Sequence, residues 1–217
     1  MTCPQPSWTR PALLLVTLLV PAVVDAQRTA SRSSPDPAKI FDALGVAAGA
    51  TVCEIGAGDG ALTIAAARLV GPTGRVYSSE LGEKRVATLR KHVAESGASQ
   101  ITVVAGEERR TNFPQAACDA VFLRDVYHHF TEPAAMNASI AMALKPGGRL
   151  AVVDFTPPNE EATCPADRDQ DGRHGVRPES VTRELKEAGF EPVASDEQGQ
   201  RWFMVVLVKP KPPASGT

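Results

Sequence analysis

The chain has 217 residues, a length that fits one domain with a substantial core and leaves little room for a second. Its hydrophobic content of 43% is ordinary for a globular protein. The 23 basic and 25 acidic residues give a net charge of -2, so no general electrostatic attraction favours a nucleic-acid or anionic-membrane partner, and we predict no nucleic-acid partner.

An apolar run at the N-terminus predicts an export signal. Arg10 precedes the apolar residues 12–24, and short side chains follow, as in a cleavable signal peptide over residues 1–26. A membrane-spanning helix needs about 20 apolar residues, whereas this run is shorter and contains Pro21. We therefore expect an exported protein with no stable membrane span once the signal is removed. Anchoring by an uncleaved segment is the alternative.

Strands and helices alternate through the rest of the chain. After a flexible lead-in at 27–37, the predicted helices are a short one around 40–44 and longer ones at 61–69, 84–94, 133–144 and 178–188. The predicted strands are 52–55, 75–80, 101–104, 120–123, 150–153, 190–194 and 202–208.

Continuous apolar strands separated by helices indicate a parallel sheet that is covered on both faces. The last two strands are joined only by a polar turn, which predicts a closing antiparallel pair. We therefore expect one α/β domain over residues 38–208, a Rossmann-like doubly wound sheet that is mostly parallel. The tail at 209–217 is predicted to be disordered.

Three glycines, Gly56, Gly58 and Gly60, stand between the first strand and the helix that follows it. A strand, a glycine turn and a helix in succession can form a nucleotide pocket, because residues without side chains let backbone N–H groups approach the ligand. Taken alone, the turn is compatible with NAD, FAD and other nucleotides.

Acidic residues stand at or near the ends of three predicted strands beside this turn. Glu54 precedes the first glycine, where a carboxylate would face a cationic ligand. Glu80 closes the second strand and is placed to accept hydrogen bonds from both ribose hydroxyls. Glu107 follows the third strand, where it can reach an adenine amino group. Because three acidic residues stand at matching positions beside the glycine turn, we interpret them as parts of a ligand site rather than as solvated side chains at the strand ends.

Two further segments complete the pattern. Arg124 and Asp125 follow the fourth strand in a Leu-Arg-Asp-Val segment, and a Lys-Pro-Gly-Gly turn at 145–148 precedes the fifth. Together these features resemble the class I S-adenosylmethionine-dependent methyltransferases. They are nearest in motif to the quinone-biosynthesis C-methyltransferase branch, which carries Leu-Arg-Asn-Val instead, so Asp125 departs from that branch.

The resemblance implies a seven-stranded sheet with an antiparallel last strand, and S-adenosylmethionine as the cofactor. It places the methionine part of the cofactor on the glycine turn and the ribose on Glu80, and it counts Glu54, Glu107, Arg124 and Asp125 among the cofactor-binding candidates. The implied reaction is in-line displacement of the methyl group from the sulfonium by a nucleophile on a small or medium-sized acceptor.

A base is needed if that nucleophile carries a proton. His128 and His129 follow the fourth strand on the ligand side and are the catalytic candidates, with His174 of the long polar segment 156–177 as a third. A purely structural role for these imidazoles is equally open. Two other functions also stay open: an NAD-linked oxidoreductase, and a non-catalytic exported module that keeps the fold.

Neither a disulfide framework nor a metal site is predicted. Cys53 and Cys118 fall in strands, where a buried thiol commonly acts as a small hydrophobic side chain, and with Cys164 they leave an odd number after signal removal. Residues 167–172 resemble the first half of a calcium loop, but the position of its closing Glu is Pro178. We therefore interpret this segment as a polar lid over the substrate.

Overall fold

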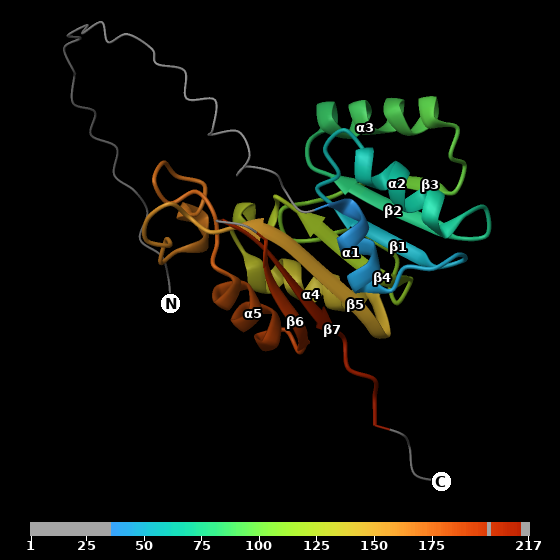
Figure 1. Cartoon of the computed structure of the whole chain (residues 1–217). Helices are drawn as coiled ribbons and strands as arrows, with labels where there is room; N and C mark the ends of the chain where they lie inside the picture. The colour runs from blue at the N-terminus through green and yellow to red at the C-terminus, as the bar shows by residue number, and fades with distance from the viewer. Residues whose placement is uncertain (1–35, 199–200, 214–217) are drawn as a thin grey trace, which may run out of the picture. The chain divides into compact units, whose positions relative to one another are not determined.

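The computed structural model of the protein describes residues 36–198 and 201–213 (Figure 1). The predicted signal at 1–26 and the lead-in up to position 35 lie outside the described residues. The strands are β1 (Thr51–Ile55), β2 (Arg75–Glu80), β3 (Ile101–Ala105), β4 (Cys118–Arg124), β5 (Leu144–Phe155), β6 (Glu191–Gln198) and β7 (Trp202–Val208). The helices are α1 (Pro37–Leu44), α2 (Ala61–Val70), α3 (Glu83–Ser96), α4 (Pro133–Ala143) and α5 (Pro178–Glu187), with short 3-10 turns η1 (Tyr127–His129) and η2 (Pro165–Asp167). None of these helices is long and apolar enough to cross a membrane.

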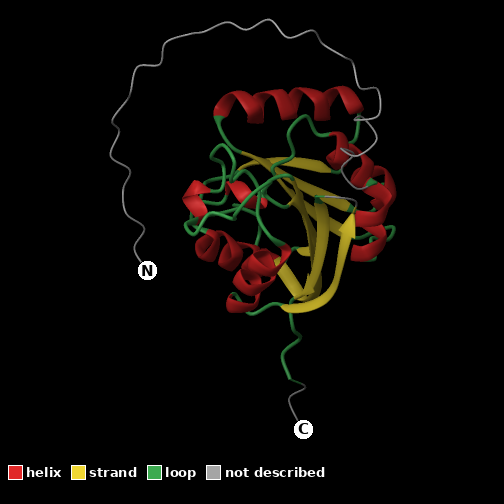
Figure 2. Ribbon diagram, turned by 60° about the vertical axis from the view of Figure 1, so that its left-hand side comes forward, coloured by secondary structure: helices red, strands yellow, loops and turns green. Residues whose placement is uncertain are grey.

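In this described part of the chain, seven strands form one sheet in the order β3-β2-β1-β4-β5-β7-β6. The strand pairs from β3 through to β5 are parallel, whereas β7 runs antiparallel to both β5 and β6. Helices cover both faces of the sheet (Figure 2). The predicted Rossmann-like sheet with its antiparallel last strand is confirmed. Because the strand order reverses between β1 and β4, the carboxyl ends of these two strands border the crevice where such sheets bind ligands.

The middle of strand β4, residues 120–123, is apolar because both of its faces are buried. In β4, Val121 and Leu123 belong to a core shared with Ile140 of α4, whereas Phe122 belongs to a second core shared with Phe41 of α1. The Phe41 and Phe122 rings meet edge to face with centroids 5.4 Å apart. This double burial explains the continuous apolar runs from which the parallel sheet was predicted.

Strand β5 is longer than predicted because it includes the Pro-Gly-Gly segment. Leu144 pairs with Cys118 and Arg149 pairs with Ala120, so residues 145–148 bulge out of the ladder between these two pairs. The segment predicted as a tight turn before the strand is therefore a bulge within it.

A disulfide joins Cys53 of β1 to Cys118 of β4, with the two Cα atoms 5.9 Å apart. The prediction that these residues are unpaired hydrophobic thiols is wrong. They are separated by 65 positions in the chain. Only the adjacency of β1 and β4 in the sheet brings them together, and sequence spacing does not reveal that adjacency.

Lys209 ties the segment after β7 to the domain. Its Nζ donates hydrogen bonds to the carbonyl oxygens of Ala141 at 2.6 Å and Leu144 at 2.7 Å, at the end of α4. A cation at this position also complements the negative end of the helix dipole. The first residue of the tail predicted at 209–217 thus has specific contacts.

Candidate functional site

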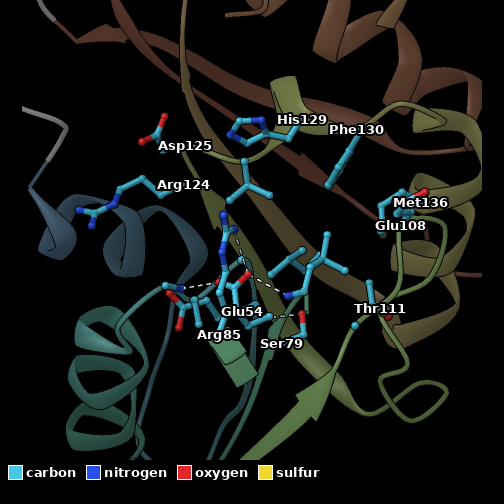
Figure 3. Close-up of a pocket in the computed structure, with 18 of the residues that line it drawn as sticks. Glu54, Ser79, Arg85, Glu108, Thr111, Arg124, Asp125, His129, Phe130 and Met136 are labelled. Atoms are coloured by element: carbon cyan, nitrogen blue, oxygen red, sulfur yellow. Dashed lines mark hydrogen bonds and ion pairs between the residues drawn. The ribbon is translucent and has the colours of Figure 1, made fainter. Parts of the chain in front are cut away.

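A cavity of about 540 Å³ opens at the carboxyl ends of the parallel strands (Figure 3). This volume is typical of pockets for small molecules and cofactors. Most of the residues predicted from the sequence line it: Glu54, Gly56, Gly58, Glu80, Glu107, Arg124, Asp125 and His129. Gly60 and His128 do not line the cavity. Gly60 lies at the start of α2, and His128 is buried.

The glycine turn requires glycine for two different reasons. Gly56, Gly58 and Gly60 all have left-handed backbones, with φ of 70°, 57° and 87°. A Cβ on Gly56 would overlap the side chain of Val126, and one on Gly60 would lie 2.8 Å from Leu89 Cδ1. A Cβ on Gly58 would meet nothing within 4 Å. Gly56 and Gly60 therefore permit close packing of the turn, while Gly58 borders open space.

Glu80 is fixed at the pocket wall by backbone N–H groups. Its Oε2 accepts from Gly58 N at 2.7 Å, and its Oε1 accepts from Leu81 N at 2.8 Å. Arg85 Nη1 lies 3.7 Å from Oε1. Each carboxylate oxygen can accept more than one hydrogen bond, so a diol can still bind to this preoriented group.

Glu54 lies buried beneath the turn. Its carboxylate accepts hydrogen bonds from the hydroxyls of Thr63 on α2 and Ser78 on β2, the second at 3.5 Å. Burial raises the pKa of Glu54 to about 8, and the Thr63 hydrogen bond opposes that rise only in part. At pH 7 this side chain is therefore a neutral acid that is engaged with hydroxyls, rather than the carboxylate facing a cationic ligand that was expected from the sequence.

Glu107 lies at the outer rim of the pocket, just beyond β3. Its carboxylate accepts hydrogen bonds from Asn112 Nδ2 at 3.1 Å and Arg110 Nη2 at 2.9 Å. These partners, Asn112 first, lower the pKa of Glu107 below its ordinary value. An ionised carboxylate at this position could accept a hydrogen bond from an adenine amino group. That contact stays a prediction.

The chain turns sharply where β4 ends. Asp125 has a left-handed backbone with φ of 63°, and its N–H donates to Val153 O at 2.9 Å. Asp is among the few residues that adopt this conformation readily. The turn leaves both Arg124 and Asp125 among the residues that line the pocket (Figure 3).

The two histidines after β4 have different positions. His129 lines the pocket, and partial burial, followed by the charge of neighbouring His128, lowers its pKa. His128 is buried behind it, with Nδ1 2.9 Å from Asp154 Oδ1 and Nε2 3.0 Å from His174 Nε2. Of the two predicted bases, only His129 borders the pocket.

Two buried polar side chains that organise this region, Asp154 and Arg168, were not predicted from the sequence. Asp154 lies at the carboxyl end of β5, the edge where ligands bind, and that position alone was a signal that could have identified it. Arg168 is 2% exposed and pairs with Glu184 and Glu161, which holds the segment 156–177 against α5. No sequence pattern marks Arg168.

Comparisons with known proteins agree with this geometry. Residues 53–152 match the model of the methyltransferase domain family. The ubiquinone/menaquinone biosynthesis C-methyltransferase UbiE of Saccharophagus degradans is 32% identical over 115 residues, which cover 52% of this chain and 46% of that protein. This chain thus spans about half the length of the curated relatives it matches.

Solved structures show the same fold. An S-adenosylmethionine-dependent methyltransferase from Aquifex aeolicus superposes with a TM-score of 0.69 at 25% identity, over 80% of this chain and 89% of that one. Geranyl diphosphate C-methyltransferase from Streptomyces coelicolor, in complex with Mg²⁺, geranyl diphosphate and S-adenosylhomocysteine, gives 0.67 at 12% identity, over 80% and 76%. The second likeness concerns the fold alone.

Proposed function

We propose that this chain, which carries a class I S-adenosylmethionine-dependent methyltransferase domain, transfers the methyl group of S-adenosylmethionine to a small or medium-sized acceptor. The observation that carries the proposal is Glu80, which backbone N–H groups of Gly58 and Leu81 hold in the pocket formed by the glycine turn. The same turn is compatible with NAD, but the family match over residues 53–152 favours S-adenosylmethionine.

The cofactor supplies the activated methyl group, so the chain has to bind, orient and exclude water. The glycine turn and Glu80 hold the cofactor on one side of the pocket. Phe130 and Met136 lie on the side opposite Ser79 (Figure 3) and form an apolar part of the wall for the acceptor. An apolar acceptor seated on this wall would displace water from the reacting centre.

A binding and transfer experiment tests the proposal. The purified protein is titrated calorimetrically with S-adenosylmethionine, S-adenosylhomocysteine and NAD, and is then incubated with labelled S-adenosylmethionine and cell extract. We expect both adenosyl ligands to bind, NAD not to bind, and label to appear in a small molecule. Failure to bind either adenosyl ligand would overturn the proposal, and binding without any transfer would favour the non-catalytic module.

We also propose that the protein is exported. The apolar N-terminal run motivates this proposal, and the disulfide between Cys53 and Cys118 supports it, because disulfides persist mainly in oxidising compartments. How a cofactor made in the cytoplasm would reach an exported enzyme then becomes part of the function to be explained.

A further inference from the structure

Three of the four histidines of the chain gather beside the pocket, together with one carboxylate. His128 and His129 come from η1, and Asp169 and His174 come from the segment after β5. One ligating atom from each of the four side chains lies within 4.8 Å of the others. His128 Nε2 is 3.0 Å from His174 Nε2, which is 3.3 Å from Asp169 Oδ1. His129 Nδ1 is 3.5 Å from the same oxygen.

These separations fit the edges of a small coordination polyhedron. Bonds of about 2.0 to 2.1 Å from Zn²⁺ to nitrogen or oxygen imply ligand-to-ligand distances of about 3.4 Å in a tetrahedron. The three distances fall between 3.0 and 3.5 Å. Three imidazoles and one carboxylate suit Zn²⁺ and neighbouring transition metals, whereas Mg²⁺ and Ca²⁺ prefer oxygen ligands.

Asp154 orients His128 in the manner of an outer-shell carboxylate. Its Oδ1 lies 2.9 Å from His128 Nδ1 and accepts from Phe155 N, while its Oδ2 accepts from the backbone N of His128. A carboxylate at Nδ1 selects the tautomer whose Nε2 lone pair is free, and Nε2 is the atom that meets His174. Because the protein's own donors already engage Asp154, we assign it to support rather than to ligation.

The segment that carries Asp169 and His174 is also held in place. Val176 N donates to Phe155 O at 3.0 Å, and Gly175 N donates to Arg168 O at 3.1 Å. A Cβ on Gly175 would lie 2.5 Å from Phe155 O, so glycine lets the backbone reach the end of β5. These contacts therefore fix the backbone on both sides of Asp169 and His174.

We propose that His128, His129, Asp169 and His174 bind a divalent transition-metal ion of the Zn²⁺ class, which ties the segment 156–177 to the end of β4. His129 and Asp169 also line the pocket, so the ion would stand in its wall. No metal site was predicted from the sequence, and these four side chains, spread over 46 positions, form no short metal-binding motif. A metal-bound His129 cannot also accept the acceptor's proton, so ligand and base are alternative roles for this residue.

The test uses the tag-free protein after treatment with a chelator. Calorimetric titration with ZnCl₂ is expected to show one tight site, and equal additions of MgCl₂ or CaCl₂ to show none. CoCl₂ should produce the visible absorption bands of four-coordinate cobalt. His174→Ala should weaken zinc binding by at least about 100-fold, and Asp154→Asn should weaken it by about 10- to 100-fold. The matched control is His92→Ala, which changes the one histidine outside the cluster and should leave zinc affinity unchanged.

His174 and His129 are half exposed, so their variants should fold even if a change at buried His128 prevents folding. Far-ultraviolet circular dichroism checks that each variant is folded. Absence of tight zinc binding to the wild-type protein, or equal affinity in the wild type and folded His174→Ala, overturns the inference. Neither result bears on S-adenosylmethionine binding at Glu80, which is measured separately.

Discussion

At the scale of single residues, we expect recognition of the cofactor to depend on the carboxylate of Glu80, which backbone N–H groups hold at the pocket. Glu80→Ala removes the predicted acceptor for the ribose hydroxyls and also leaves the N–H groups of Gly58 and Leu81 without their partner. Hydrogen bonds to a charged group contribute about 1.5 to 3 kcal/mol, so we expect S-adenosylmethionine affinity to fall by about 10- to 100-fold. Calorimetry measures the loss.

Glu83→Ala, which removes an exposed carboxylate in the first turn of α3, is the control and should bind S-adenosylmethionine normally. Equal affinities for the two variants would show that the ribose site lies elsewhere.

Glu54 leads to a prediction about pH. Its pKa is about 8 in the folded protein against an ordinary value of 4.5, so between these values the folded state holds a proton that the unfolded chain has lost. The contribution of this group to stability is therefore fully present at low pH and is lost as the pH rises through about 8. Glu54→Gln replaces the acid by a neutral side chain that can still bond to the hydroxyls.

We expect the stability of the wild-type protein, relative to Glu54→Gln, to fall by a few kcal/mol between about pH 5 and about pH 9. Urea unfolding of both proteins across this range measures the difference, and other titrating groups cancel in the comparison. A difference that does not change with pH would mean that Glu54 is ionised in the folded protein throughout the range.

At the scale of elements, the disulfide joins two central strands, β1 and β4. Closing a loop of 65 positions restricts the unfolded chain, and loss of such a bond costs about 2 to 5 kcal/mol. We expect Cys53→Ala, Cys118→Ala and the double variant to lose similar amounts of stability in urea unfolding, because each change breaks the same bond. Single losses that add up in the double variant would instead indicate two independent hydrophobic side chains.

The elements themselves were largely predictable. Helix ends coincide with local signals, such as Pro178 at the start of α5 and Gly45, with φ of 66°, at the end of α1. The bulge at 145–148 was not predictable, because its form depends on the register between β4 and β5 and not on the Pro-Gly-Gly sequence alone.

At the scale of the whole molecule, export is the property to test. The full chain and a variant that lacks residues 1–26 are expressed in a bacterium with an oxidising periplasm. We expect the full chain in the periplasm, shortened by its signal, with Cys53 and Cys118 unreactive to a thiol reagent until the protein is reduced. The shortened variant should stay in the cytoplasm with reactive thiols. Recovery of the intact full-length chain from the cytoplasm would contradict export.

The fold class and most of the residues that line the candidate site could be predicted from the sequence, because apolar runs, helix ends, glycines and strand-end acids are local patterns along the chain. The pairing of Cys53 with Cys118, the burial and neutral state of Glu54, and the place of His128 behind His129 could be seen only in the folded structure. These properties depend on the order of strands in the sheet and on the degree of burial, and neither is encoded at a fixed spacing. The same holds for His174, which meets His128 across 46 positions of chain because the segment after β5 folds back onto the end of β4.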